Sequence, residues 1–279
     1  MPIHIVGPIA WDSIIETHEN QSSESIIHAK LKNGRPGGQG LNVACALKSA
    51  GLDVVLHGYV GDDDHGVALK NYMNSMEIDM KFVSTKPVAT AHVLVMIDNN
   101  GERSMTGLQK SYAKEVKIDA ASVCNSDFVI WPVWFSAFRE DLELIKNIGA
   151  RAAIGLRGVT DEQAKAEILI TSDIEEITER ALANYSRAYI SSGSQGGLFY
   201  SNRDEWRIGA PRVDVVDTTG AGDAFMSGVI WGEIQGRKPL ETLKIAILWG
   251  SYATEMKSSV PPTFSQLKSR FPAYSELFN

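Results

Sequence analysis

The sequence predicts a three-layer α/β fold, in which a mostly parallel central sheet is covered by helices on both faces and a small β-sheet stands apart. From residue 128 onward, short apolar runs alternate with segments of helical spacing, and repeated strand-then-helix units build parallel sheets. Before that point, a hairpin pattern at residues 91–105 and a polar segment at 19–32 differ from their surroundings, which indicates a second, small sheet. Because no Pro-, Gly- and Ser-rich linker divides the chain, we expect one domain over residues 1–279.

The first half of the chain supplies two buried strands and two helices. Residues 3–7 and 54–56 are short apolar runs that predict strands. A glycine-rich loop at residues 34–40 precedes small and apolar residues at helical spacing over 43–50. The acidic turn at residues 61–66 favours the start of a second helix over a metal site, since Asp is a preferred capping residue.

The second half supplies the larger part of the sheet. The predicted strands are residues 128–131, 152–156, 168–171 and 188–191. Helical spacing predicts helices at residues 139–147 and 174–184 between them. Residues 196–202 begin with a glycine turn directly after a strand, so we expect an antiparallel edge there.

The bulk composition disfavours several classes of partner. The formal net charge is -7 at pH 7, which argues against nucleic acid or an anionic membrane as the main partner. Cys45 and Cys124 lack metal-ligand spacing, so we expect buried free thiols in a reducing compartment. The N-terminus does not resemble a signal peptide and no apolar run reaches membrane-spanning length, so we expect a cytoplasmic protein.

The most informative motif is residues 215–225, Val-Val-Asp-Thr-Thr-Gly-Ala-Gly-Asp-Ala-Phe, where a strand end runs into a helix start. The amides of Gly220, Ala221 and Gly222 would lie at a helix N-terminus, where unpaired donors favour an anion such as a transferring phosphoryl group. Asp223, at the start of the same helix, can accept the proton of a substrate hydroxyl. A Gly-x-Gly-Asp sequence alone would indicate only a helix cap, and the full run favours phosphoryl transfer.

This run resembles the C-terminal signature of the ribokinase-like carbohydrate kinases, the PfkB family. Residues 37–44, Gly-Gly-Gln-Gly-Leu-Asn-Val-Ala, resemble its N-terminal signature, and the similarity extends from Gly7 to about Glu255. The resemblance implies a ribokinase-like fold with a β lid from about residues 13–33 and 86–107. It also implies ATP-dependent phosphorylation of a hydroxyl on a small sugar-like substrate, with Mg²⁺ and, as in some relatives, K⁺. Because a small exposed sheet needs its apolar face covered, we expect a homodimer through the lid.

The resemblance implies a substrate site near the end of the first strand. Asp12 matches the residue that grips substrate hydroxyls in the family. Gly37 and Gly38 would let a polyol approach the backbone, and Asn42 would bind adjacent hydroxyls. Arg103 of the lid could reach the substrate, with ordinary packing in the lid as the alternative.

The nucleotide side is matched less completely. The implied ATP-binding residues are Ser191, Gly193 and Gly196. The family's Asn-x-x-Glu element, which organises Mg²⁺, is matched by Ser172 to Glu175, so the carboxylate is kept while Ser replaces Asn. The Asp217 loop would hold a monovalent cation, as in some relatives. After Ala253 the expected glycine turn is missing, which leaves nucleotide preference open.

The sequence does not identify the acceptor. Nucleoside and sugar-phosphate kinases share the fold, and Gln39 stands where a Lys is often found, so a contact to a substrate phosphate would come from Arg35 or Arg103. A non-catalytic sugar-binding sensor is the alternative from another class, favoured by Ser172 and disfavoured by the intact Asp223 turn. A Rossmann dehydrogenase would need a glycine fingerprint after the first strand, which is absent.

Overall fold

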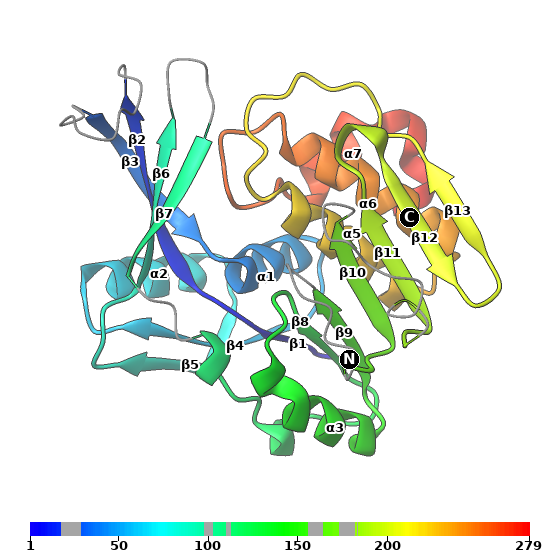
Figure 1. The fold of residues 1–279 in the computed structure, drawn as a ribbon, viewed down its shortest axis with the longest axis horizontal. Coiled ribbons are helices and arrows are strands. Elements are labelled where there is room, and N and C mark those ends of the chain that lie inside the picture. Colours follow the sequence, from blue (N-terminus) through cyan, green and yellow to red (C-terminus); the bar gives the residue numbers. More distant parts are fainter. Residues whose placement is uncertain (18–28, 98–102, 110–112, 156–163, 173–181, 183) are drawn as a thin grey trace.

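The structure is a computed structural model that describes residues 1–17, 29–97, 103–109, 113–155, 164–172, 182 and 184–279. These residues form a nine-stranded sheet and a separate four-stranded sheet (Figure 1). The predicted fold class is confirmed, because the larger sheet is mostly parallel, helices cover both its faces, and the small sheet stands apart.

The strand order of the large sheet is β13-β12-β11-β10-β9-β8-β1-β4-β5. The strands are β1 (Ile3–Val6), β4 (Val54–Gly61), β5 (Asp79–Lys86), β8 (Phe128–Trp131), β9 (Arg151–Gly155), β10 (Ile168–Ser172), β11 (Arg187–Ser191), β12 (Gly197–Ser201) and β13 (Glu205–Ile208). Pairing is parallel from β5 to β11 and antiparallel at β12 and β13, as predicted for that edge. The sequence patterns did not predict β5 and β13, because exposed polar residues in these edge strands break up any apolar run.

Two cores hold the helices against opposite faces of this sheet. The α-helices are α1 (Gln39–Ser49), α2 (Asp64–Ser75), α3 (Arg139–Ile148), α5 (Ala221–Ile234), α6 (Pro239–Ala253) and α7 (Phe264–Arg270). Short 3-10 helices are η1 (Ala113–Glu115), η2 (Ala120–Ser122), η3 (Ser136–Phe138), η4 (Gly193–Gln195) and η5 (Pro272–Phe278). Ile3 and Ile5 of β1 pack with α1, α5 and α6, whereas Val6 belongs to the core under α3. Most of the predicted helix at 174–184 lies outside the described residues.

The small sheet has the order β3-β2-β6-β7 and projects to one side of the large sheet (Figure 1). Its strands are β2 (Ala10–Thr17), β3 (Ala29–Gly37), β6 (Ala91–Ile97) and β7 (Arg103–Gln109). The predicted hairpin is therefore present as β6 and β7, and its turn lies outside the described residues. The prediction of a loop at 34–40 was wrong for residues 34–37, which pair with β2 and end β3.

Two expectations from composition can be compared with the structure. Cys45 is buried in α1, where burial raises the pKa of its thiol to about 12, but Cys124 is exposed in a turn, so the expectation of two buried thiols was half wrong. Within the described residues, every helix is too short or too polar to span a membrane.

Candidate active site

The start of helix α5 is a turn whose geometry only glycine allows. Gly220 has a φ of 80°, and a Cβ at this position would collide with the carbonyl oxygen of Ser259. At Gly222, by contrast, an added Cβ would meet nothing within 4 Å, so this side of the turn faces open space. The first amides of a helix have no acceptor within it, although the Ala221 amide approaches the Thr218 carbonyl at 3.3 Å. The turn therefore offers backbone donors and a positive helix end to an anion.

Asp223 lies in the first turn of α5 and is joined to α1 across the core. The side-chain amide of Asn42 donates to Oδ2 of Asp223 at 2.7 Å, although the two residues are 181 positions apart. Asn42 is 3% exposed, and its Oδ1 atom has no hydrogen-bond partner in the described structure. The structure thus brings together the residue predicted to act as base and a residue predicted to bind the substrate.

Asp12 of β2 lies directly over the glycine loop. A Cβ on Gly37 would stand 2.5 Å from Oδ2 of Asp12, and one on Gly38 would stand 2.6 Å from the Pro8 carbonyl oxygen. Burial raises the pKa of the Asp12 carboxyl, while the Ser259 hydroxyl, Arg35 and His92 act in the opposite direction. The absence of a side chain at Gly37 is what allows the Asp12 carboxylate to occupy this place, and its absence at Gly38 lets the loop pack against the backbone of Pro8 and Ala10.

Arg35 and Ser259 join the small sheet to the Asp217 loop. Nη1 of Arg35 lies 3.5 Å from Oδ2 of Asp217, whose Oδ1 accepts from the Thr219 amide at 2.7 Å. The Ser259 hydroxyl donates to the carbonyl of Pro36 at 3.1 Å. The sequence suggested Arg35 only as a contact for a substrate phosphate. Ser259 belongs to no recognisable motif, so no sequence signal could have identified it.

The predicted nucleotide residues lie at the carboxyl end of β11, the edge at which open α/β sheets bind ligands. Ser191 is the last residue of this strand, and its hydroxyl donates to the Thr171 carbonyl at 3.3 Å. Gly193 begins η4 with a φ of 52°, and Gly196 has a φ of 97°. Their positive φ values make the tight turn into β12 that residues with a Cβ would resist.

The remaining predicted site residues are only partly described. Arg103 begins β7, and its side chain lies outside the described residues, as does the whole of Glu175. In the described part of the chain, no group of three or more His, Cys, Asp or Glu is placed to hold a metal ion.

Comparisons with known proteins identify the family and the fold of this chain. A family model described as pfkB family carbohydrate kinase matches residues 5–131 and 157–263. An ATP-dependent ribose-1-phosphate kinase from Halopiger xanaduensis is 27% identical over 250 residues, which cover 80% of this chain and 82% of that protein. Ribokinase from Bacillus subtilis is 24% identical over 265 residues, which cover 88% and 89%. A solved structure of Burkholderia thailandensis nucleoside kinase in complex with inosine has the same fold, with a TM-score of 0.83 at 19% identity over 98% of this chain and 96% of that one.

Proposed function

The chain belongs to the pfkB family of carbohydrate kinases, and on that premise we propose that it transfers the γ-phosphoryl group of ATP to a hydroxyl of a small sugar-like molecule, with Asp223 as the general base. The observation that carries the proposal is the hydrogen bond between Asn42 and Asp223 beside the open turn of α5. It places a carboxylate, an amide and a helix N-terminus together. These are the groups that an attacking hydroxyl and a migrating phosphoryl group require.

In this proposal the substrate lies between Asp12, the glycine loop and Asn42. Asp12 accepts hydrogen bonds from substrate hydroxyls, and the bare backbone at Gly37 and Gly38 lets a polyol approach closely. The unpartnered Oδ1 of Asn42 supports a role in binding, because buried polar atoms in folded proteins usually have a partner.

Asp223 takes the proton from the attacking hydroxyl, and the amides of Gly220, Ala221 and Gly222 hold the oxygens of the migrating group. A carboxylate at a helix start can hold its negative charge there, since the helix dipole favours it. We assign the nucleotide to the turn at Ser191, Gly193 and Gly196, where the described backbone is held in positive-φ conformations.

Mg²⁺ bound with ATP would neutralise phosphate charge, and Glu175 is the carboxylate proposed to hold it. Glu175 lies outside the described residues, so this assignment rests on the sequence motif. Arg103 is likewise proposed as a substrate contact from its place in β7.

The acceptor belongs to one of three classes, namely free sugars, nucleosides and sugar phosphates. The relatives are named for ribose 1-phosphate, ribose and nucleosides, so the names alone do not choose between them. We favour a neutral polyol as the acceptor. Arg35, the residue that could contact a substrate phosphate, lies close to Asp12, and its charge is already balanced by Asp12 and Asp217.

The test is a panel of free sugars, nucleosides and sugar phosphates incubated with ATP and Mg²⁺. We expect ADP formation that depends on the acceptor, with a product heavier by one phosphoryl group in the mass spectrum. Nucleotide and sugar binding without turnover across the whole panel would instead support the sensor. The Asp204→Asn variant changes a residue in an exposed turn and serves as the control for effects of mutation and purification.

A homodimer through the small sheet remains a prediction. Leu31 is 65% exposed on β3 and, in the register of the sheet, lies on the same face as the partly exposed Ile15 and Met96, so an apolar surface is available to a second copy. Light scattering of the wild-type protein and of a Leu31→Glu variant would test it, since a dimer formed through this face should dissociate when a charge is introduced.

A further inference from the structure

Arg35 carries a positive charge from the small sheet into the body of the protein. It lies opposite Asp12 in the antiparallel register of β2 and β3. Its Nη1 atom lies 3.5 Å from Oδ2 of Asp217, and the two side chains are only 11% and 6% exposed. The contact therefore joins two parts of the chain that are 182 residues apart, in a place largely withdrawn from water.

This contact lies where three segments meet beside the start of α5. The amides of Val216 and Asp217 both donate to the carbonyl of Thr254, at 2.7 and 2.9 Å. Ser259 binds the end of β3 through its hydroxyl and abuts Gly220 through its carbonyl. A displacement of Asp217 would therefore be transmitted to the turn that is proposed to bind the phosphoryl group.

The expected monovalent cation does not fit beside Asp217. Such an ion needs several oxygen ligands and no neighbouring positive charge. Here Oδ1 of Asp217 accepts from the Thr219 amide, and Oδ2 faces the Arg35 guanidinium. Because a guanidinium stays protonated in proteins, a second cation at this carboxylate would meet a like charge in a poorly solvated place.

We propose that Arg35 is a built-in cation that replaces a monovalent metal ion beside Asp217 and positions the anion-binding turn at Gly220 to Gly222. Arg35 is a positioning residue in this scheme, because it acts through Asp217 and the loop. The kinetic part of the inference rests on the proposed function, whereas the part that concerns ion binding does not.

The first experiment measures ion selectivity without any reaction. The melting temperature of the wild-type protein, alone and with Mg²⁺ and ADP, is recorded in KCl, NaCl and tetramethylammonium chloride at equal ionic strength. We expect the three salts to give melting temperatures within about 1 °C of each other. A K⁺-selective rise of several degrees would overturn the proposal, even if no acceptor is ever found.

The second experiment compares Arg35→Met, which removes the charge and keeps a long flexible side chain, with Arg35→Lys, which keeps the charge. We expect Arg35→Met to lose at least tenfold in kcat and to gain a K⁺-selective rise in melting temperature, because the Asp217 carboxylate becomes available to an ion. Arg35→Lys should keep kcat within about fivefold of wild type and show no K⁺ response. Arg203→Met, in an exposed turn, is the matched control.

These variants separate an electrostatic role from packing. Loss of packing alone would lower the melting temperature of Arg35→Met equally in all three salts, and that result would contradict the proposal. If Arg35→Met does not fold, Arg35→Lys decides the second experiment, since a K⁺ requirement in that variant would contradict the assignment. Failure of the whole acceptor panel would count against the proposed function and leave the melting series as the test of Arg35.

Discussion

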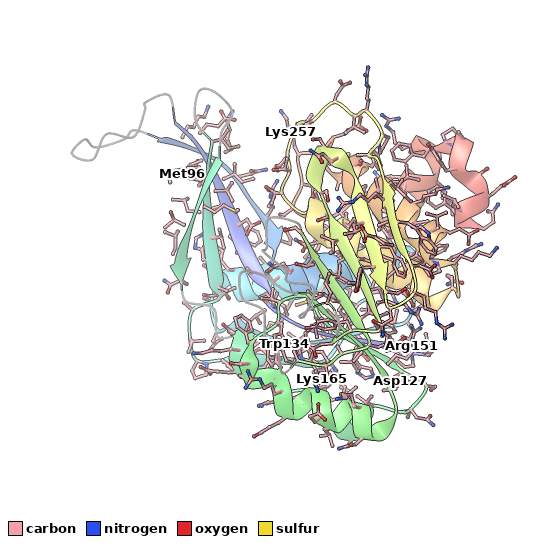
Figure 2. The ribbon with its side chains drawn as sticks, turned by 45° about the vertical axis from the view of Figure 1, so that its right-hand side comes forward. Met96, Asp127, Trp134, Arg151, Lys165 and Lys257 are labelled. Carbon is pink, nitrogen blue, oxygen red and sulfur yellow. The ribbon has the colours of Figure 1, made fainter. Side chains whose placement is uncertain are left out.

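Helix α5 carries a carboxylate near each end, and the two ends are built differently. Near its C-terminal end, Glu233 is 2% exposed and accepts from Arg151 at 2.8 Å and from the Tyr189 hydroxyl at 2.6 Å, while Arg187 forms a further ion pair with it. Near its start, Asp223 is bound by Asn42. Among the described residues, Oδ1 of Asn42 and Nε and Nη2 of Arg35 have no hydrogen-bond partner. In Figure 2, Arg151, a partner of Glu233, lies low in the molecule. Lys257, from the segment that contacts the Asp217 loop, lies near the top.

The difference separates a structural network from the end of α5 that we propose as the reacting end. A carboxylate near a helix C-terminus opposes the helix dipole, so Glu233 needs its two arginines to remain charged when buried. Asp223 lies at the opposite end of the helix, where the dipole favours a negative charge. Burial also raises the pKa of the Asp12 carboxyl, so the folded protein holds this ionised group at some cost in stability.

The largest effect should come from Asp223→Asn, which tests whether the start of α5 is the reacting end. Loss of the base and of its charge should lower kcat by about 10³-fold or more, with the free energy of unfolding changed by less than about 1 kcal/mol. Steady-state kinetics and urea unfolding measure both quantities. Asp214→Asn, which changes an exposed carboxylate in the loop before α5, should leave kcat unchanged, and a near-normal rate in Asp223→Asn would remove the assignment.

The opposite result is expected at the other end of the helix. Glu233→Gln removes the more deeply buried of the two carboxylates, Glu233 and Glu167, that the half-buried Arg151 and Arg187 share, which should lower the free energy of unfolding by about 3 kcal/mol. At a temperature where this variant is folded, kcat should stay within about twofold of wild type. A selective loss of kcat without loss of stability would show that the two ends are not separate in function.

A smaller effect should follow from pH, through a buried pair away from the cleft. Nδ1 of His4 lies 2.9 Å from Nε2 of His57, and Asp127 lies 3.6 Å from His4. Burial lowers the pKa of His4 and lowers the pKa of His57 to about 3. Below about pH 6.5 the unfolded chain binds protons that the folded protein does not, so stability falls as pH falls.

We therefore expect the free energy of unfolding to be about 2 kcal/mol lower at pH 5 than at pH 7.5. Urea unfolding at the two pH values measures the difference. His57→Phe, which can keep the stacking on Phe82, should reduce it. An equal pH dependence in this variant would assign the effect to other groups.

The smallest change in stability is expected for Asp12→Asn. The raised pKa of Asp12 means that its ionised form is disfavoured in the folded protein, so at neutral pH a neutral Asn should raise the free energy of unfolding by up to about 1 kcal/mol. The same variant should raise the KM for the acceptor about tenfold or more. A destabilised Asp12→Asn protein would show that this carboxylate is a structural group like Glu233.

The sequence was sufficient where short-range patterns decide the structure. The apolar runs at 128–131 and 168–171 became β8 and β10, and the glycines near Asp223 became the turn at the start of α5. It was insufficient where distant segments meet. The contact of Arg35 with Asp217 depends on how the small sheet is placed against the body, which no local pattern encodes.

Strand β2 shows the same limit on a smaller scale. Asp12 was expected from its match to the family, but the β lid was expected to begin only at about residue 13, so the start of β2 at Ala10 was missed. Its polar residues Asp12, Ser13 and Glu16 interrupt the apolar alternation, and pairing with β3 and β6 is what makes the segment extended.

The hydrogen bond between Asn42 and Asp223 also bears on how the protein is made. Its partners are separated by 181 residues, and β1 forms its sheet partnership with β8 only after residue 128 has been added. A growing chain on the ribosome therefore exposes the glycine loop and Asp12 long before their counterpart exists. Ligand binding cannot assist folding until synthesis is nearly finished, and such distant contacts close slowly. The last quarter of the chain must therefore be made before the contact between α1 and α5 can form.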